Sequence, residues 1–256
     1  MNRRIALRLE YDGTGFSGSQ AQLGQRTVQG VLEAALESTT GEERRIEFAG
    51  RTDAGVHATG QVAALDTQRE YSPATFRAAL SHVLPEDVAV RAAAEVGQHF
   101  DPRRDAVSRC YRYEIEDRRE RSPLRRHRAW QRRRQLDVAA MAAAVGQLPR
   151  ELADWAAFAA PAAEGYPTVR TLLDMSVRRC GPHRVSVSVE ADGFLQHQVR
   201  RMVGALVEVG EGALTPAGYA ELLDGPPGSV GPTAPPQGLM LVAVRYPPGT
   251  VEWDDE

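Results

Sequence analysis

The first hundred residues switch between two hydrophobic periods. Ile5, Leu7 and Leu9 are spaced two apart, which predicts a half-buried strand. After Thr27, which can cap a helix, apolar residues recur every three or four positions, as on the buried face of a helix. This alternation predicts strand, helix, strand, strand, helix and strand over residues 4–10, 27–41, 45–49, 61–65, 72–84 and 87–96.

Ser72 and Pro73 are expected to start the second of these helices. Its inward side chains should be those of Phe76, Leu80, Val83 and Leu84.

The rest of the chain repeats a similar rhythm without a detectable sequence repeat. Val185, Val187 and Val189 alternate cleanly along one expected strand. The predicted elements are strand, helix, strand, strand, helix, helix and strand over residues 108–116, 137–147, 171–178, 184–190, 194–209, 215–225 and 239–246, with Asp137 as the cap of the first helix. The Pro- and Gly-rich stretch 225–238 is expected to be a long loop.

Two parts of this kind predict an α+β fold with helices on one face of antiparallel or mixed sheets. We expect one half over residues 1–100 and a second over residues 105–246. The acidic tail, residues 247–256, is expected to fray.

Composition is ordinary for a globular protein, at 42% hydrophobic and 25% charged residues in a chain of 256. The positive N-terminus has no apolar segment behind it, and no apolar run approaches about 18 residues, so we expect neither a signal peptide nor a membrane span. Cys110 and Cys180 are too few for a disulfide framework or a metal cluster. These features predict a cytoplasmic protein with no metal site.

Arginine supplies all 31 basic residues, although the net charge is −3. The densest basic region is residues 118–134, where Trp130 interleaves. Such a run is either a solvated surface of an arginine-rich chain or a patch that binds phosphate, and the sequence leaves both interpretations open.

The segment Gly50 to His57, GRTDAGVH, places Asp53 in a glycine-flanked loop between two predicted strands. A loop between strands can present one carboxylate on a rigid frame. Taken alone, the simpler interpretation is a turn in which Asp53 bonds nearby backbone.

The same octapeptide resembles the signature loop of the tRNA pseudouridine synthase A (TruA) family. Other segments that resemble the family follow in its order: residues 10–14 (EYDGT), 27–30 (TVQG), 110–113 (CYRY), 194–200 (FLQHQVR) and 233–239 (TAPPQGL). The resemblance spans roughly residues 3–246, which is nearly the whole chain.

This resemblance implies two related α/β halves, ferredoxin-like, whose sheets join side by side with an active cleft between them. It also implies a homodimer that binds tRNA and isomerises uridine to pseudouridine at positions 38, 39 and 40 of the anticodon stem-loop. The reaction needs no cofactor, and the chain contains neither a P-loop nor a dinucleotide-binding motif. The expected class is an isomerase.

In the family, the residue that matches Asp53 is the catalytic nucleophile, and the position of Arg200 pairs with it. The resemblance also implies that Tyr111 stacks on the target uracil and that Arg51 enters the space the extruded base leaves. His57 is expected either to bond phosphate or to stabilise the loop.

Each of these residues also has a structural interpretation. Arg200, like its neighbour Arg201, could be a solvated helix arginine, and Arg51 a salt bridge that holds the loop. Tyr111 and Tyr113 share a strand face and could both be packing residues, which is the role we assign to Tyr113.

The chain departs from the family pattern in two places, which lie outside the three core catalytic positions and concern the details of the grip on RNA. Many members have Gly-Trp-Gln where this chain has Gly18-Ser19-Gln20, and residues 101–106 also differ. The loop 231–238 matches a family segment near the cleft and is expected to be structural support.

Two alternatives to the enzyme remain: a non-catalytic tRNA-binding or folding module, and the same chemistry on another RNA or a free nucleotide. The intact positions 53, 111 and 200 weigh against a binding module, and the arginine-rich surface favours a polymer.

Overall fold

The computed structural model describes residues 2–160 and 167–254. The chain forms two compact units. Unit 1 comprises Met1–Val107 together with Leu241–Glu256, and unit 2 comprises Ser108–Met240. Within the described ranges, no helix is both long enough and apolar enough to span a membrane.

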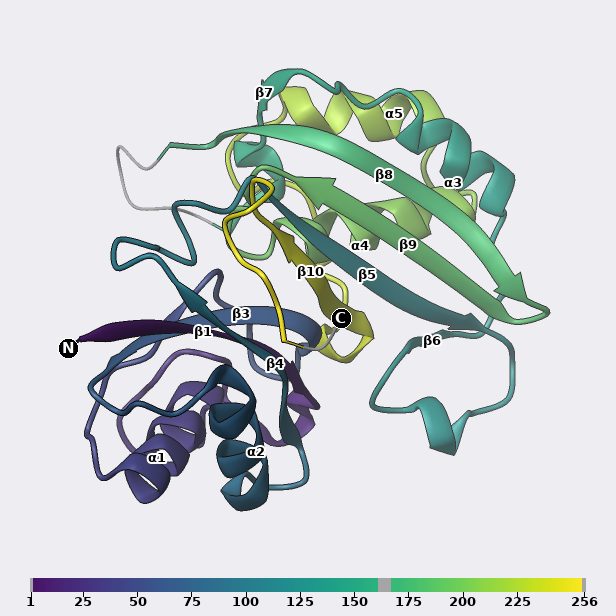
Figure 1. The fold of residues 1–256 in the computed structure, drawn as a ribbon. Helices are drawn as coiled ribbons and strands as arrows, with labels where there is room; N and C mark the ends of the chain where they lie inside the picture. Colours follow the sequence, from purple (N-terminus) through teal and green to yellow (C-terminus); the bar gives the residue numbers. More distant parts are fainter. Residues whose placement is uncertain (1, 161–166, 255–256) are drawn as a thin grey trace. The chain divides into compact units, whose positions relative to one another are not determined.

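Unit 1 follows the predicted order of strand, helix, strand, strand, helix and strand. The elements are β1 (Arg3–Tyr11), α1 (Val28–Thr40), β2 (Glu47–Phe48), β3 (His57–Thr67), α2 (Pro73–Val83) and β4 (Val88–Val96). Strand β1 lies between β4 and β3 and is antiparallel to both, so that Leu7 faces Ala93 on one side and Ala63 on the other. Helices α1 and α2 lie together on one side of these strands (Figure 1).

Both helices begin at the caps that the sequence predicts. Thr27 Oγ1 accepts a hydrogen bond from Gly30 N at 3.2 Å, and Ser72 Oγ accepts from Thr75 N at 3.1 Å. Gly41 ends α1 with a φ of 69°, a left-handed value that glycine adopts without strain. The prediction that Val83 points inward is wrong, because α2 ends at this residue and its side chain is 41% exposed.

The C-terminal tail packs against unit 1, so the expectation that it frays is wrong for its described residues. Val251 and Trp253 lie against a buried cluster formed by Ala6, Ala64, Ala94, Val96 and Phe100. Asp254 Oδ1 accepts a hydrogen bond from Ala93 N at 2.9 Å. The last strand, β10 (Leu239–Arg245), lies beside β3 and leads into this tail.

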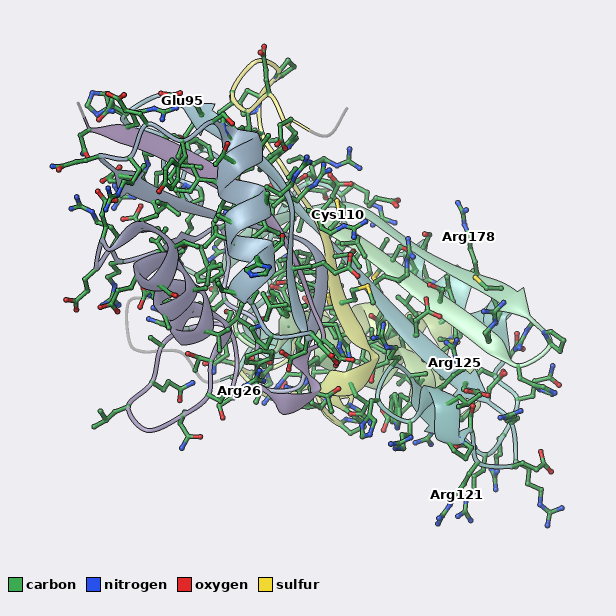
Figure 2. The ribbon with its side chains drawn as sticks, turned by 60° about the horizontal axis from the view of Figure 1, so that its bottom comes forward. Arg26, Glu95, Cys110, Arg121, Arg125 and Arg178 are labelled. Atoms are coloured by element: carbon green, nitrogen blue, oxygen red, sulfur yellow. The ribbon has the colours of Figure 1, made fainter. Side chains whose placement is uncertain are left out.

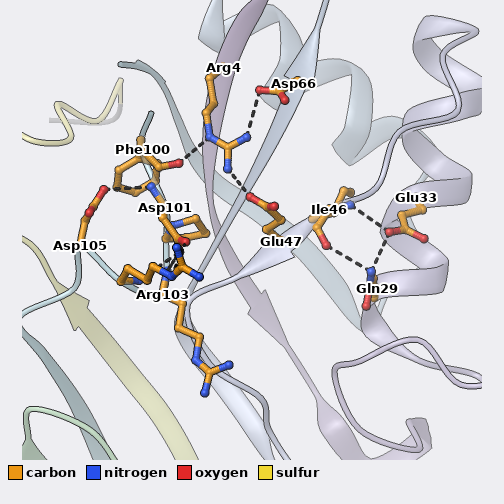
Figure 3. Close-up of polar contacts among 12 residues, drawn as sticks. Arg4, Gln29, Glu33, Ile46, Glu47, Asp66, Phe100, Asp101, Arg103 and Asp105 are labelled. Carbon is orange, nitrogen blue, oxygen red and sulfur yellow. Dashed lines mark hydrogen bonds and ion pairs between the residues drawn. The ribbon is translucent and has the colours of Figure 1, made fainter. Parts of the chain in front are cut away.

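Arg4 fixes the segment that follows β4 (Figure 3). Its buried side chain donates to Phe100 O at 2.6 Å and forms ion pairs with Asp66, at 3.0 Å, and with Glu47. The guanidinium therefore ties β1 to three other segments of the unit, with each bond aimed by its planar fork.

Unit 2 is built on the antiparallel strands β5 (Ser108–Asp117), β9 (Arg184–Ala191) and β8 (Val169–Gly181). The short strand β7 (Leu152–Asp154) pairs with β8, and β6 (Trp130–Arg132) runs parallel to β5. Helices α3 (Val138–Val145), α4 (Gln198–Gly210) and α5 (Pro216–Glu221) pack on one face (Figure 1). The predicted α+β class is confirmed.

The predictions were incomplete in two places in unit 2. The sequence pattern missed β6 and β7, which are three residues each and too short for alternation to be visible. It also placed the start of α4 four residues too early. The helix begins at Gln198 because His197 has a φ of 62°, which interrupts helical backbone.

Candidate active site

Asp53 lies in unit 1, in the turn between β2 and β3. Val56 N donates to Asp53 O at 3.1 Å, and Gly55 has a φ of 79°. Strand β3 then begins at His57, four residues before the predicted start, so the loop is short. The Asp53 side chain is half-buried.

Thr52, directly before Asp53, is held by three hydrogen bonds. Its amide donates to Ser19 Oγ at 2.9 Å, and its carbonyl accepts from Ser19 N at 3.0 Å. Its hydroxyl lies 2.8 Å from that of Tyr11. Burial raises the pKa of Tyr11 to about 12, so this phenol stays protonated near neutral pH. These bonds anchor the backbone that presents the carboxylate.

The partner segment around Ser19 is itself fixed. Gly18 has a φ of 98°, and a Cβ there would lie 2.9 Å from Thr52 O, so no larger residue fits without strain. Ser19 O accepts from Gln29 N at 2.9 Å, at the start of α1. The Gln29 side chain donates to Ile46 O at 3.1 Å and to Glu33 (Figure 3). The bonds thus connect α1, the Ser19 segment and the Asp53 loop.

His57 is buried at 2% exposure, next to the segment after β1. Its Nδ1 accepts from Gly13 N at 3.0 Å, and Asp12 Oδ1 lies 3.2 Å from the same nitrogen. A Cβ on Gly13 would come within 2.0 Å of Val56 O, so the two segments touch directly. This geometry favours the loop-stabilising interpretation of His57. Arg51, in contrast, is exposed.

Tyr111 lies on β5 of unit 2 and is 9% exposed. Its ring meets Phe194 edge-on, with 5.2 Å between centroids and 87° between planes. An edge contact fixes the ring plane, because the positive edge of one ring faces the negative face of the other.

Arg200 is in the first turn of α4 and is bonded to the loop 231–238. Its Nε donates to Ala234 O at 2.8 Å, and Ala234 N donates to Arg200 O at 3.0 Å. A Cβ on Gly204, one turn later, would lie 1.7 Å from Pro232 O. The loop therefore packs directly on α4, as expected of a supporting segment.

Arg201, beside Arg200, and Tyr113, on the same strand as Tyr111, are the two residues for which we expected structural roles. Neither is a simple surface group. Arg201 donates to Gly228 O at 2.6 Å and to Val230 O at 3.0 Å, so it is a loop anchor and not a solvated arginine. Tyr113 is fully buried, and its hydroxyl donates to Pro235 O at 2.7 Å. Burial raises the pKa of Tyr113. Its packing role is confirmed.

The expected site residues thus divide between the units, with Arg51, Asp53 and His57 in unit 1 and Tyr111 and Arg200 in unit 2. The residues missed are the supports of the loop, namely Tyr11, Ser19, Thr52 and Gln61. Gln61 Nε2 donates to Gly50 O at 2.9 Å. Of these four, only Tyr11 and Thr52 could have been found from the sequence, because they lie within the segments that resemble the family. In the described part of the chain, no group of three or more His, Cys, Asp and Glu side chains could hold a metal ion.

Comparison with known proteins gives a consistent family. A family model described as tRNA pseudouridine synthase matches residues 9–104 and 152–247. A tRNA pseudouridine synthase A of Roseiflexus castenholzii is 49% identical over 252 residues, covering 96% of this chain and 91% of its own. The protein of the same name from Roseiflexus sp. is 47% identical, with 96% and 91% covered, and that from Chloroflexus aurantiacus is 45% identical, with 98% and 91% covered.

Proposed function

Because the chain belongs to the tRNA pseudouridine synthase A family, a family of isomerases, we propose that it converts uridine to pseudouridine at positions 38, 39 and 40 of the anticodon stem-loop, with Asp53 as nucleophile. The observation that carries the proposal is the anchoring of Thr52 beside Asp53 by both its amide and its carbonyl. A turn that merely connects two strands needs no such support, whereas a reacting carboxylate must be held in place.

The reaction breaks the bond between N1 of the base and C1′, turns the base, and joins C5 to C1′. The proton on C5 leaves and N1 gains one, so the product is an isomer of the substrate. In this proposal Asp53 acts by one of three routes: it attacks C1′, attacks C6, or promotes loss of the 2′ proton. Covalent attack divides one difficult step into easier ones.

The other residues would position the substrate. Tyr111 offers an aromatic face for stacking on the uracil, and its ring is already oriented by Phe194. Arg200 would pair with the nucleophile, as the matching position does in the family, and its Nε donates to Ala234 O within unit 2. Arg51, which is exposed, would fill the space left by the extruded base.

The test is tritium release from tRNA that carries 5-tritiated uridine. We expect Asp53→Asn to lower the rate by about 10³-fold or more, because the nucleophile is lost, while tRNA binding stays within a few-fold. Asp224→Asn, at an exposed aspartate of unit 2, is the matched control and should keep full activity.

Two results would contradict the proposal. If wild type and Asp53→Asn both bound tRNA and neither released tritium, the protein would be a binding module. If free uridine monophosphate turned over faster than tRNA or the isolated stem-loop, the substrate assignment would be wrong.

We also propose a cytoplasmic homodimer in which one tRNA contacts both subunits. Neither Cys110 nor Cys180 forms a disulfide, which suits a reducing compartment. Light scattering of the purified protein would report a mass twice that of the chain.

A further inference from the structure

The connection that follows β5 concentrates positive charge. Residues 118–134, here named the arginine loop, contain nine arginines and one glutamate, whereas the whole chain carries a net charge of −3. Codon bias would enrich arginine throughout the chain, but it does not place nine of 31 basic residues within 17 positions. The local density therefore needs a local explanation.

Three of these arginines point inward and are neutralised by acids. Arg118 and Arg125 approach the carboxylate of Glu116 at 2.8 and 3.3 Å, and Glu116 is only 5% exposed. Arg132 forms a forked contact with Glu211 at 2.6 and 2.7 Å. These pairs fasten the two ends and the middle of the arginine loop to the body of unit 2.

The backbone of the loop is also held in one shape. The Gln131 side chain accepts from Ser122 N at 3.3 Å and donates to Arg118 O at 3.3 Å, which ties the two sides of the loop together. Trp130 packs edge-on against Tyr113, with 6.3 Å between ring centroids. A loop held in this way presents its outer side chains without a large entropic cost on binding.

The remaining arginines of the loop are exposed: Arg119, Arg121, Arg126, Arg128, Arg133 and Arg134. Figure 2 shows Arg121 projecting outward from the end of the loop, with Arg125 closer to the strands. Guanidinium groups bind phosphate oxygens through two parallel hydrogen bonds, so this surface suits a polyanion with repeated phosphates.

We propose that the arginine loop binds the phosphate backbone of the substrate tRNA outside the nucleotide that reacts. The inference rests on the proposed function, which makes tRNA the polyanion that the protein must hold. The loop leaves β5 at Asp117, six residues beyond Tyr111, which is roughly 20 Å along an extended strand. The loop therefore contacts RNA several nucleotides from the base that Tyr111 would stack on.

The test compares two triple variants with the same change of net charge. Arg119→Gln, Arg121→Gln and Arg133→Gln remove three exposed guanidiniums from the loop. Arg45→Gln, Arg91→Gln and Arg178→Gln remove three exposed guanidiniums elsewhere. The Kd for full-length tRNA is measured over a series of salt concentrations, and kcat is measured by tritium release at saturating tRNA.

We expect the loop variant to bind tRNA about tenfold more weakly at 0.15 M salt. Its plot of log Kd against log salt should be shallower by about two, because each lost phosphate contact removes 0.7–0.9 of slope. The control variant should match wild type in both quantities. The kcat of the loop variant should stay within about twofold of wild type, because the reacting nucleotide is not touched.

Equal Kd values and slopes for the two triple variants would overturn the inference. So would unchanged tRNA binding combined with weaker binding of the loop variant to phosphatidylserine vesicles, which would make the loop a membrane-binding surface. Failure of the proposed function is distinguishable, since wild type would then release no tritium whatever the salt slopes show.

Discussion

The support of the Asp53 loop depends on one small residue. Ser19 is fully buried. Its Oγ accepts a hydrogen bond from Thr52 N at 2.9 Å, and its amide donates to Thr52 O at 3.0 Å. Many members of the family have tryptophan at this position. This departure from the family pattern therefore lies against the Asp53 loop, which the serine hydroxyl bonds directly.

Ser19→Ala should slow catalysis more than it weakens binding. The substitution leaves the buried Thr52 N without its acceptor, and a displaced carboxylate reacts poorly, so we expect kcat to fall about 10- to 100-fold with KM nearly unchanged. Tritium release over a range of tRNA concentrations measures both. Ser17→Ala is the matched control, because Ser17 Oγ bonds the exposed Gln25 at 2.9 Å and should leave kcat intact. An equal fall in kcat for Ser19→Ala and Ser17→Ala would contradict the role assigned to Ser19.

At the same scale, the sequence predicted Asp53 but not the residues that hold its loop. The loop could be recognised because its eight residues, 50–57, are consecutive in the sequence. Ser19 and Thr52 are 33 residues apart, and Gln61 and Tyr11 are 50 apart. Such pairs follow no period, so only the folded chain identifies them.

Element boundaries were predictable where a cap or a break lies in the adjacent residues. Asp137 caps α3 by accepting from Ala140 N at 2.9 Å, as expected. The start of α4 was misplaced because His197 adopts a left-handed conformation that the spacing of the apolar residues around it does not reveal. There, Gln198 accepts from Leu195 N at 2.8 Å and forms a tight turn before the helix.

Asp117, the last residue of β5, should make the stability of unit 2 depend on pH. The Asp117 side chain is fully buried, which raises its pKa, but bonds from Arg179, at 2.7 Å, and Leu136 N, at 2.9 Å, outweigh burial and hold the pKa below its usual range. Because the pKa is lower in the folded state, the stabilisation is present above about pH 4 and is lost as the pH falls through the folded-state value.

Asp117→Asn should therefore lower the free energy of unfolding by about 2–3 kcal/mol at pH 7, with a smaller difference from wild type below about pH 4. Urea denaturation at several pH values checks this. Asp174→Asn, at an exposed position of β8, should change neither the midpoint nor its pH dependence. A difference from wild type that stayed constant down to pH 2 would contradict the assigned sign.

At the scale of the whole molecule, the C-terminal tail packs against unit 1. The acidic composition of residues 247–256 suggests a solvated tail, yet Trp253 lies against the Ala6 cluster and under Arg8, whose guanidinium carbon is 5.4 Å from the ring centroid. The Ala6 cluster lies on the side of the unit 1 strands that carries no helix, and without the tail it would meet water. The tail covers it, which explains why Leu241–Glu256 belongs with the N-terminal unit.

Trp253→Ala should destabilise the protein by about 1–2 kcal/mol, because a half-buried aromatic side chain loses part of its apolar burial. Thermal unfolding followed by circular dichroism would show a lower midpoint. Glu252→Ala, at the exposed neighbouring position, is the control and should leave the midpoint unchanged. Identical midpoints for the two variants would show that the tail adds nothing to stability.

Local chemistry in the chain was enough to predict most strands and helices, the helix caps at Thr27, Ser72 and Asp137, and the loop that carries Asp53. Those features depend on residues that are close to one another in the sequence. Tertiary structure alone decided that Ser19 supports the loop, that Arg201 anchors residues 228–230, and that the tail covers unit 1. Such contacts join segments whose faces meet only after folding, and neither composition nor periodicity encodes which faces those are.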